Sequence, residues 1–547
     1  MTGGVAEPND TPNAAGAEPP APRRALALAG GGMRVAWQAG AVRALYDAGL
    51  RFAHGDGASG GTMNLAMLLA GLSPEEMCAR WTTLDVHAFA TPMPTAAYLD
   101  APHLMAMGSA DGVVGTVFPH LGIDVARVRA ATAMTGSFNV CDFGRKTAEV
   151  IPHDDVDLDL LVAGISLPIF MPPVRARGTT WTDAVWIRDT NLTECVRRGA
   201  EELWLLWCIG NTPTYYPGAF RQYVHMIEMS AAGALNEELA RLDALNRRIA
   251  AGEPGPGGQT RPVTLHVVAP RYPLPLDPDF YLGRVDARTL VAMGYADGVR
   301  ALAGYLADQR AGRAPAGVPL TPEATRMQDE PLGVTFREVM HGGFAFGETD
   351  PAAGAARGAR EGTALELHAA VTVHDVPRFV ADPAHAGELV GTVDVPGLGA
   401  GIPGARGVFN LFRPGESPGL KLMVYELAFT HAGRPYYLAG RKEVHDDPGF
   451  DMLRDTTTLF TRLHEGEDAT GAVVGAGVLR LDARDLTALL STMRPVGAHD
   501  AADGAAALAT FARFFAGELL DTYGGALGGV LGRLTRPAAA GAVGTVS

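Results

Sequence analysis

Two successive units of strand, glycine turn and helix begin near residue 25, and they constrain the fold more than any other feature of this sequence. In the first unit, "ALALAGGGMRVAWQAGAVRALYDAGL", a short apolar run ends at Gly30-Gly31-Gly32 and a helical pattern closes at Gly49. The second unit runs through "RFAHGD", a turn around Ser59, and the helical "TMNLAMLLAGLS". Strands that alternate with helices predict a buried, mainly parallel sheet in an α/β domain.

Later segments extend this pattern. We expect a long helix over residues 219–251, a strand at "VTLHVVAP" and a helix near residues 289–308, and two further apolar runs are "LDLLVAGIS" and "ELWLLWCIG". Residues 75–150 are expected to be mostly helical or irregular. Because "RAPAGVPLTPEA" has the composition of a linker, the α/β domain is predicted to span residues 24–315.

The period of the pattern changes after this linker. Apolar residues alternate in "ALELHAAVTVHDV", and "KLMVYELAFTHAGRPYYLAGRKEV" reads as two strands joined by a turn. We therefore expect a β-rich accessory domain, a barrel or a sandwich, with a C-terminal helix, over residues 330–530. Residues 1–23 are rich in Pro, Gly and Ala and predict a disordered leader, and residues 531–547 predict a flexible tail.

Composition excludes several classes of function. The 60 Asp and Glu residues outnumber the 45 Lys and Arg residues, and the net charge of -15 disfavours a nucleic-acid partner. No apolar run approaches the roughly 20 residues that span a bilayer, so the expected location is the cytoplasm, with any membrane contact peripheral. The four cysteines form no CxxC pair and the histidines no HExxH motif, so we expect neither a disulfide framework nor a metal site. The oligomeric state stays open.

Chemistry is suggested by the Gly-x-Ser-x-Gly pattern at residues 57–61. A serine hydroxyl becomes a nucleophile only when a base removes its proton and a set of donors stabilises the resulting oxyanion. Ser59 has the small neighbours that a sharp strand-to-helix turn requires, and it would lie at a helix N-terminus, where the dipole favours negative charge. The alternative is a structural turn in a chain that contains 68 glycines.

The triple glycine supplies a candidate oxyanion hole. The amides of Gly30, Gly31 and Gly32 would be unobstructed by side chains, and Arg34 could support this loop. The same glycines could open a dinucleotide-binding fingerprint, but Val35 stands where its third glycine belongs. An ordinary α/β-hydrolase with a distant His is disfavoured, because only one β-α unit precedes Ser59.

With these motifs in order, "LALAGGGMRVAWQAGAVRALYDAGL" followed by "GASGGTMNLAMLLAG" resembles the start of a patatin-like phospholipase domain. Further along, "SLPIFMPPV" is similar to a Ser-x-Pro segment of that family, and "MGYADGVRAL" resembles its closing helix, so the resemblance covers roughly residues 25–310. It implies a three-layer α/β fold, a Ser-Asp dyad, a glycine-rich oxyanion loop and no cofactor.

The resemblance leaves two acids to compete for the base, Asp183 and Asp189. Counting sixteen residues back from Gly199, which begins a Gly-Ala pair of the family pattern, gives Asp183, and Asp189 then takes the place of a common Asn. The family's Asp motif continues with small residues, where this chain has Ala184 and Val185 and a turn requiring positive φ would disfavour Val. Two other departures are Val35 after the Arg and Asp56, a charge in a strand expected to be buried.

The function implied is a serine acyl hydrolase of lipid esters, a phospholipase A or lipid esterase. In it Asp183 would take the Ser59 proton and Gly30 to Gly32 would hold the oxyanion. The alternative is a catalytically inactive lipid-binding or regulatory protein, which Val35, Asp56 and Ala184-Val185 favour. The C-terminal segment resembles accessory segments of bacterial cholesterol-oxidase-like and lipase-like proteins, and a packing role suits it equally well.

Overall fold

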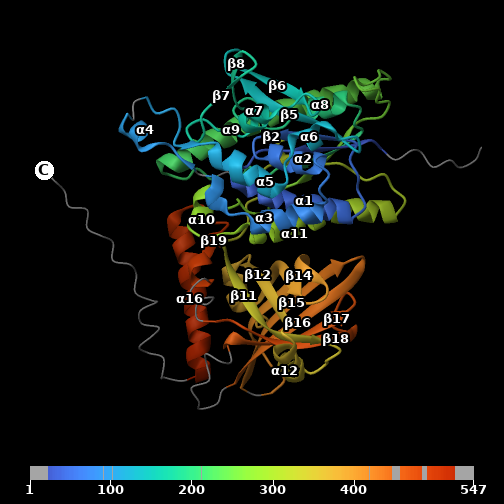
Figure 1. Ribbon diagram of the computed structural model, residues 1–547. Helices are drawn as coiled ribbons and strands as arrows, with labels where there is room; N and C mark the ends of the chain where they lie inside the picture. The colour runs from blue at the N-terminus through green and yellow to red at the C-terminus, as the bar shows by residue number, and fades with distance from the viewer. Residues whose placement is uncertain are drawn as a thin grey trace, which may run out of the picture.

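A mixed eight-stranded sheet and a nine-stranded antiparallel sheet organise the protein. The computed structural model describes residues 22–523 except residues 90, 101–102, 211, 213, 418, 446–455 and 483–488. Figure 1 shows the α/β part above the β-rich part, with α16 beside the latter. The expected tail at 531–547 and all but the last two residues of the expected leader lie outside the described residues.

The N-terminal sheet is mainly parallel, as predicted, with an antiparallel side. The strands β10, β9, β1, β2 and β5 run parallel to one another, and β6, β7 and β8 are joined by antiparallel pairs. In sheet order the strands are β10 (Thr264–Val268), β9 (Glu202–Leu206), β1 (Arg24–Leu28), β2 (His54–Ala58), β5 (Thr135–Asp142), β8 (Thr179–Asp183) and β7 (Val174–Ala176), and β6 (Thr147–Pro152) pairs with β5.

Helices cover both faces of this sheet, which gives the three layers that the sequence predicted. Alternate residues of β1 enter two different cores: Leu26 and Leu28 face one, and Ala25 and Ala27 face the other. The first core includes residues of α1 (Ala36–Asp47), α2 (Gly61–Leu69), α3 (Pro74–Thr83) and α11 (Ala287–Arg310). The second includes residues of α8 (Leu192–Arg197) and α9 (Ala219–Ala250).

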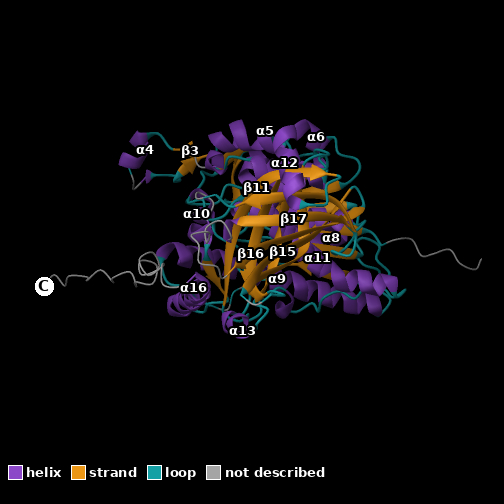
Figure 2. Ribbon diagram, turned by 90° about the horizontal axis from the view of Figure 1, so that it is seen from below, coloured by secondary structure: helices purple, strands orange, loops and turns teal. Residues whose placement is uncertain are grey.

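Short elements complete this part of the chain. They are η1 (Gly32–Val35), η2 (Val86–Phe89), β3 (Thr91–Pro92), α4 (Thr95–Leu99), β4 (Gly108–Ser109), η4 (Val113–Val117), α5 (Phe118–Leu121), α6 (Val125–Arg129), α7 (Leu158–Gly164) and α10 (Asp277–Tyr281). The small β3–β4 hairpin holds α4 between its strands. In both views α4 projects from the body of the molecule (Figures 1 and 2).

Residues 75–150 are mostly helical or irregular, as predicted, but they also contain the strand β5 and much of β6. The sequence of β5 resembles a loop because Ser137 and Asn139 are polar. Both residues are nevertheless buried, and their side chains donate hydrogen bonds to the Asp56 carboxylate inside the sheet. The apolar run "LDLLVAGIS" forms the helix α7, because Asp157 accepts a hydrogen bond from the amide of Leu160 and so caps a helix.

The β-rich part is a closed antiparallel barrel, which resolves the choice between barrel and sandwich. Strands β11 to β18 pair in sequence, β11 pairs with both β12 and β18 to close the cylinder, and β19 extends from β11. The strands are β11 (Gly333–Phe346), β12 (Ala364–Val373), β13 (Ala386–Val395), β14 (Gly399–Pro414), β15 (Leu420–His431), β16 (Arg434–His445), β17 (Thr458–Glu465), β18 (Ala472–Arg480) and β19 (Arg494–Val496).

The helical segments beside the barrel include η5 (Pro322–Ala324), α12 (Pro351–Glu361), α13 (Val376–Ala381) and α16 (Ala501–Tyr523). The last confirms the predicted C-terminal helix: Phe511 packs against Phe336 of β11 and Phe379 of α13. None of the helices in the described ranges combines the length and apolar character that crossing a bilayer requires.

Helix α11 lies between the two parts and packs against both. On one side it approaches α1 so closely that a Cβ on Gly294 would come within 1.8 Å of the Trp37 carbonyl oxygen. On the other side Ala296 packs against Ala370 and Val390 of the barrel, and Arg288 forms an ion pair of 2.7 Å with Asp394. The domain boundary placed at residue 315 by the sequence stays a prediction.

Candidate active site

Ser59 occupies a sharp turn between β2 and α2. Its φ of 49° is in the left-handed region, which is uncommon for a residue with a side chain. The turn is tight enough that neighbouring glycines are required: a Cβ on Gly61 would come within 2.1 Å of the Leu28 carbonyl oxygen, and one on Gly60 within 2.7 Å of the Gly32 carbonyl oxygen. The glycines of the sequence pattern therefore let the Ser59 turn lie directly against the end of β1.

Asp183 lies at the end of β8, and its side chain meets Ser59. The Ser59 hydroxyl donates a hydrogen bond of 2.6 Å to Oδ2 of Asp183, across 124 residues of chain. The other carboxylate oxygen accepts a 2.8 Å hydrogen bond from the Val185 amide. Ser59 is 7% exposed and Asp183 is 2% exposed. The pair is thus formed in a nearly closed environment, with the Asp183 carboxylate fixed from two sides.

Burial controls the protonation of this carboxylate. Desolvation raises the pKa of Asp183 to about 7, opposed by the hydrogen bonds from Ser59 and Val185. A carboxylate with an ordinary pKa near 3.8 would be a weak acceptor for a serine proton, so the raised pKa makes Asp183 a stronger base near neutral pH.

Asp189, the competing acid, lies beside Gly30 of the glycine loop. Its Oδ1 accepts a 2.9 Å hydrogen bond from the amide of Gly30, whereas the Ser59 hydroxyl donates to Asp183. A Cβ on Gly30 would come within 2.3 Å of Asp189 Oδ1 and 2.7 Å of Ser59 Cβ. Burial, and next the charge of Asp183, raise the pKa of Asp189 well above its usual value. Asp189 is therefore protonated more readily than an ordinary aspartic acid, and it holds the glycine loop through the Gly30 amide.

The amide of Gly30 donates to Asp189, whereas no such partner of the Gly31 and Gly32 amides is seen within the part of the chain that the structure describes. Arg34 supports the loop as the sequence suggested, because its Nε donates to the Gly31 carbonyl at 2.9 Å. Gly32 has a φ of 58°, and a Cβ there would come within 2.6 Å of an Asp277 carboxylate oxygen. Glycine is thus required at this position for both reasons.

Sequence reasoning missed the residues that brace the loop from behind. Asp277 accepts a 3.2 Å hydrogen bond from the Met33 amide, and the thiol of Cys208 donates to the Gly30 carbonyl at 2.9 Å. Both come from distant parts of the chain, at the start of α10 and just after β9. The motif "LDPDF" around Asp277 carries a helix-start signal but nothing that relates it to the loop.

The departures from the family pattern do not disturb this geometry. Val35 has a φ of -66°, an ordinary helical value. Neither Ala184 nor Val185 adopts a positive φ, so the conformation that valine would tolerate poorly does not arise. The Val185 amide instead fixes Asp183.

Asp56 is buried in the middle of β2 but is fully engaged. Its carboxylate accepts hydrogen bonds of 2.5 Å from the Ser137 hydroxyl and 2.7 Å from Asn139. Asn139 in turn accepts one of 3.0 Å from Asn191, the N-cap residue of α8. Burial raises the pKa of Asp56 to about 7, against these two hydrogen bonds. The residue therefore ties β2 to β5 and α8 and does not contact Ser59 through any of these bonds.

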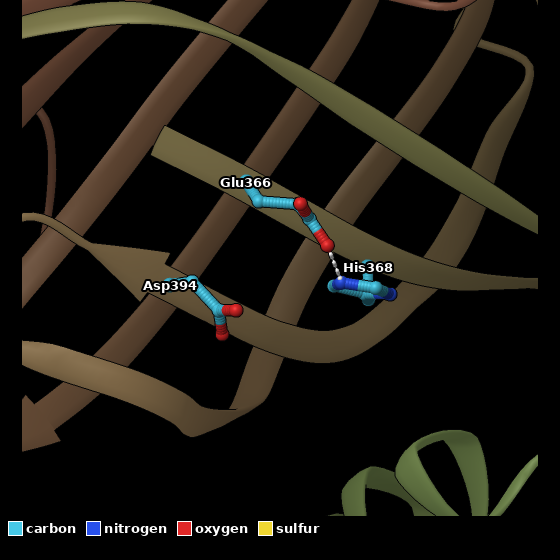
Figure 3. A group of neighbouring side chains, drawn as sticks. All are labelled: Glu366, His368 and Asp394. Atoms are coloured by element: carbon cyan, nitrogen blue, oxygen red, sulfur yellow. Dashed lines mark hydrogen bonds and ion pairs between the residues drawn. The ribbon is translucent and has the colours of Figure 1, made fainter. Parts of the chain in front are cut away.

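A group with metal-ligand chemistry lies elsewhere, on the barrel. Ligand atoms of Glu366, His368 and Asp394 lie within 4.8 Å of one another (Figure 3). His368 binds Glu366, and Asp394 already accepts the Arg288 guanidinium at 2.7 Å and the Gly401 amide at 2.6 Å. These contacts make the group an ion-pair network beside α11, and the sequence did not reveal it because its members come from two strands.

The fold and the turn at Ser59 define an α/β domain with an elbow between a parallel strand and a helix, the position that serine acyl hydrolases use for a nucleophile. Residues 26–196 match the model of the patatin-like phospholipase family, so this part of the chain is a patatin-like phospholipase domain, as its motifs predicted.

Two further comparisons add little to this. Among solved structures, VipD from Legionella pneumophila is similar to the chain at 12% identity over 52% of this chain and 67% of that chain, with a TM-score of 0.28, a level that carries no argument. A comparison with curated proteins gives no significant match. The resemblances of the "MGYADGVRAL" helix and of the C-terminal segment stay predictions.

Proposed function

We propose that the patatin-like domain hydrolyses carboxylic esters of lipids, with Ser59 as the nucleophile and Asp183 as its base. The observation that carries this proposal is the 2.6 Å hydrogen bond from the Ser59 hydroxyl to the buried Asp183 carboxylate, at a strained turn inside the segment that matches the family. Strained backbone of this kind persists where the surrounding structure fixes it, and it is concentrated at functional sites.

The reaction follows from this arrangement. Asp183 accepts the Ser59 proton as Oγ attacks the ester carbonyl carbon, and the carbonyl oxygen becomes an oxyanion facing the amides of the glycine loop. The tetrahedral intermediate then expels the alcohol, which takes the proton from Asp183. Water attacks the acyl-serine with Asp183 again accepting a proton, and the fatty acid leaves as the Ser59 hydroxyl is restored. No cofactor takes part in this proposal.

A fluorophosphonate probe tests the nucleophile directly. We expect wild-type protein to become labelled at one equivalent and Ser59→Ala to remain unlabelled, because the probe reacts only with an activated serine hydroxyl. Ser109→Ala, on the small hairpin, is the matched control and should label like the wild type. Equal labelling of the wild type and Ser59→Ala would refute the assignment of the nucleophile.

The pKa of Asp183 predicts the pH dependence of turnover. Because the base must be ionised and burial raises its pKa to about 7, kcat/KM for a soluble ester should rise about tenfold per pH unit below pH 7 and level off above it. The sign is opposite for stability: the neutral carboxyl stabilises the fold below pH ~4, and this contribution is lost as the pH rises through about 7. A pH–rate profile of Asp189→Asn should keep the same inflection, and an inflection near pH 4 would contradict the assignment.

A further inference from the structure

Five large apolar side chains are exposed on one side of the α/β domain. Leu99 at the end of α4 is 85% exposed, Met105 and Met107 are each 58% exposed, Ile169 is 54% exposed, and Phe220 in the first turn of α9 is 39% exposed. Single exposed apolar residues are ordinary on protein surfaces, but a contiguous group marks an interaction surface. We call these five residues the apolar rim.

Hydrogen bonds and ring contacts join the segments that carry the rim. The hydroxyl of Tyr98, beside Leu99, donates to the Met107 carbonyl at 2.7 Å, and the Met107 amide donates to the Ile169 carbonyl at 2.7 Å. Phe170 then packs edge-on against Phe220, with 6.4 Å between ring centroids. The α4 hairpin, the loop after α7 and the start of α9 therefore form one continuous surface, on the side where α4 projects in Figure 1.

The same segments lead directly to the Ser59–Asp183 pair. The amide of Asp183 donates to the carbonyl of Ser166 at 3.1 Å, three residues before Ile169. Tyr223 packs against Phe170 with 5.4 Å between centroids, and its pKa is raised to about 12 by burial and then by the charge of Asp183. One side of the loop after α7 thus borders the Ser59–Asp183 pair, and its other side belongs to the apolar rim.

The backbone of Ile169, one of the rim residues, has a strained conformation. Ile169 has a φ of 79°, in the left-handed region that a β-branched residue rarely adopts. The loop is fixed in this conformation by two hydrogen bonds, which the Ile169 and Phe170 carbonyls accept from the amides of Met107 and Gly108. The exposed side chain is therefore built into the loop.

Charge selects the kind of apolar partner. From residue 81 to residue 126 the chain has no Lys or Arg, while Asp100 and Asp111 lie in or beside the α4 hairpin. The protein as a whole carries a net charge of -15. Attraction to anionic lipid needs clustered basic residues near the surface. The α4 hairpin side of the rim instead carries these acids, and Arg221 stands beside Phe220 on α9. A zwitterionic lipid layer presents apolar interior without repelling these acids.

We propose that the apolar rim docks the protein on a zwitterionic phospholipid layer and thereby brings lipid esters to Ser59. The inference rests on the proposed function for the fate of the lipid, but docking itself needs no turnover. Because Ser59 is almost fully buried, a substrate drawn directly from a layer held against the rim avoids crossing water as an exposed hydrocarbon chain.

Flotation with phosphatidylcholine vesicles tests the rim in the Ser59→Ala background, where no lipid is consumed. The double change Leu99→Ser and Met107→Ser should lower vesicle partitioning at least about tenfold. Each substitution removes the favourable free energy of moving an apolar side chain from water into the lipid layer. Val408→Ser is the matched control, because Val408 is 42% exposed on the barrel strand β14, outside the rim. Circular dichroism would check that each variant is folded.

The outcomes separate this inference from the proposed function. Rim-dependent binding without wild-type ester turnover would leave the docking surface standing and refute the hydrolase. Turnover of a soluble ester without any binding to phosphatidylcholine would do the reverse. Three results would each overturn the rim as a surface for zwitterionic lipid. The first is that the double variant partitions into vesicles as its Ser59→Ala parent does, and the second is that phosphatidylserine strengthens binding tenfold or more. The third result is that the rim substitutions change the mass of the protein particle in solution and leave vesicle binding unchanged.

Discussion

Replacing Ser59 with alanine is expected to lower kcat for ester hydrolysis by at least about 10⁴-fold. The substitution removes the only atom that can form the acyl intermediate, and removal of a nucleophile from a serine hydrolase leaves only the contribution of the oxyanion site and of binding. Steady-state hydrolysis of a short-chain p-nitrophenyl ester and of a dispersed phospholipid would measure it. The fold should survive, because alanine fits the space of a buried hydroxyl at the cost of one hydrogen bond.

The wild type serves as the decisive comparison in that experiment. If it hydrolyses neither ester, while it and Ser59→Ala both bind lipid vesicles, the chain is an inactive lipid-binding protein that keeps the patatin-like sheet. The structure removes two reasons for that alternative, since Val35 has an ordinary helical backbone and neither Ala184 nor Val185 has a positive φ.

Replacing Asp183 with asparagine is expected to lower kcat about 10³-fold with little change in KM. Asparagine keeps the size of the side chain and its oxygen acceptor but cannot accept the Ser59 proton, and general-base catalysis contributes roughly 10²–10⁴-fold. Because the substitution removes a buried group whose neutral form the fold already favours, the free energy of unfolding near neutral pH should not fall sharply.

Asp189→Asn is the matched control for this change. The amide oxygen of asparagine can still accept the hydrogen bond from Gly30, and the neutral amide mimics a carboxyl whose pKa is raised by burial. We expect kcat within about tenfold of the wild type. The opposite ranking of the two variants would assign the base to Asp189, and equal large losses would show that both carboxyls are needed.

The features that the sequence revealed are those set by local backbone requirements. Gly61 had to be glycine because its missing side chain leaves room for the end of β1, Gly60 because a side chain there would meet Gly32, and Gly32 because of its positive φ. Such positions leave a pattern within a few residues of one another. The alternation in β12 and the helical period of α9 and α11 are likewise local, and all three lie close to their predicted ranges.

The features that the sequence hid depend on contacts between distant residues. The bond between Gly30 and Asp189 joins residues 159 positions apart, and nothing near either one indicates that Asp189 holds the loop. Asp56 looked like an unfavourable charge because its partners Ser137 and Asn139 lie on a strand whose buried polar residues resemble a loop. Closure of the barrel depends on β11 pairing with β18, which alternation alone cannot reveal.

Because α11 packs against both the α/β part and the barrel, the two parts support each other. A cut in the linker near residue 315 would leave Arg288 without Asp394 and would uncover the surface where Ala296 meets Ala370 and Val390. The helix that completes the core of the α/β part is therefore also a wall of its interface with the barrel. The chain has two architectures that share these contacts, and a protein shortened to its α/β part would lose part of its own support.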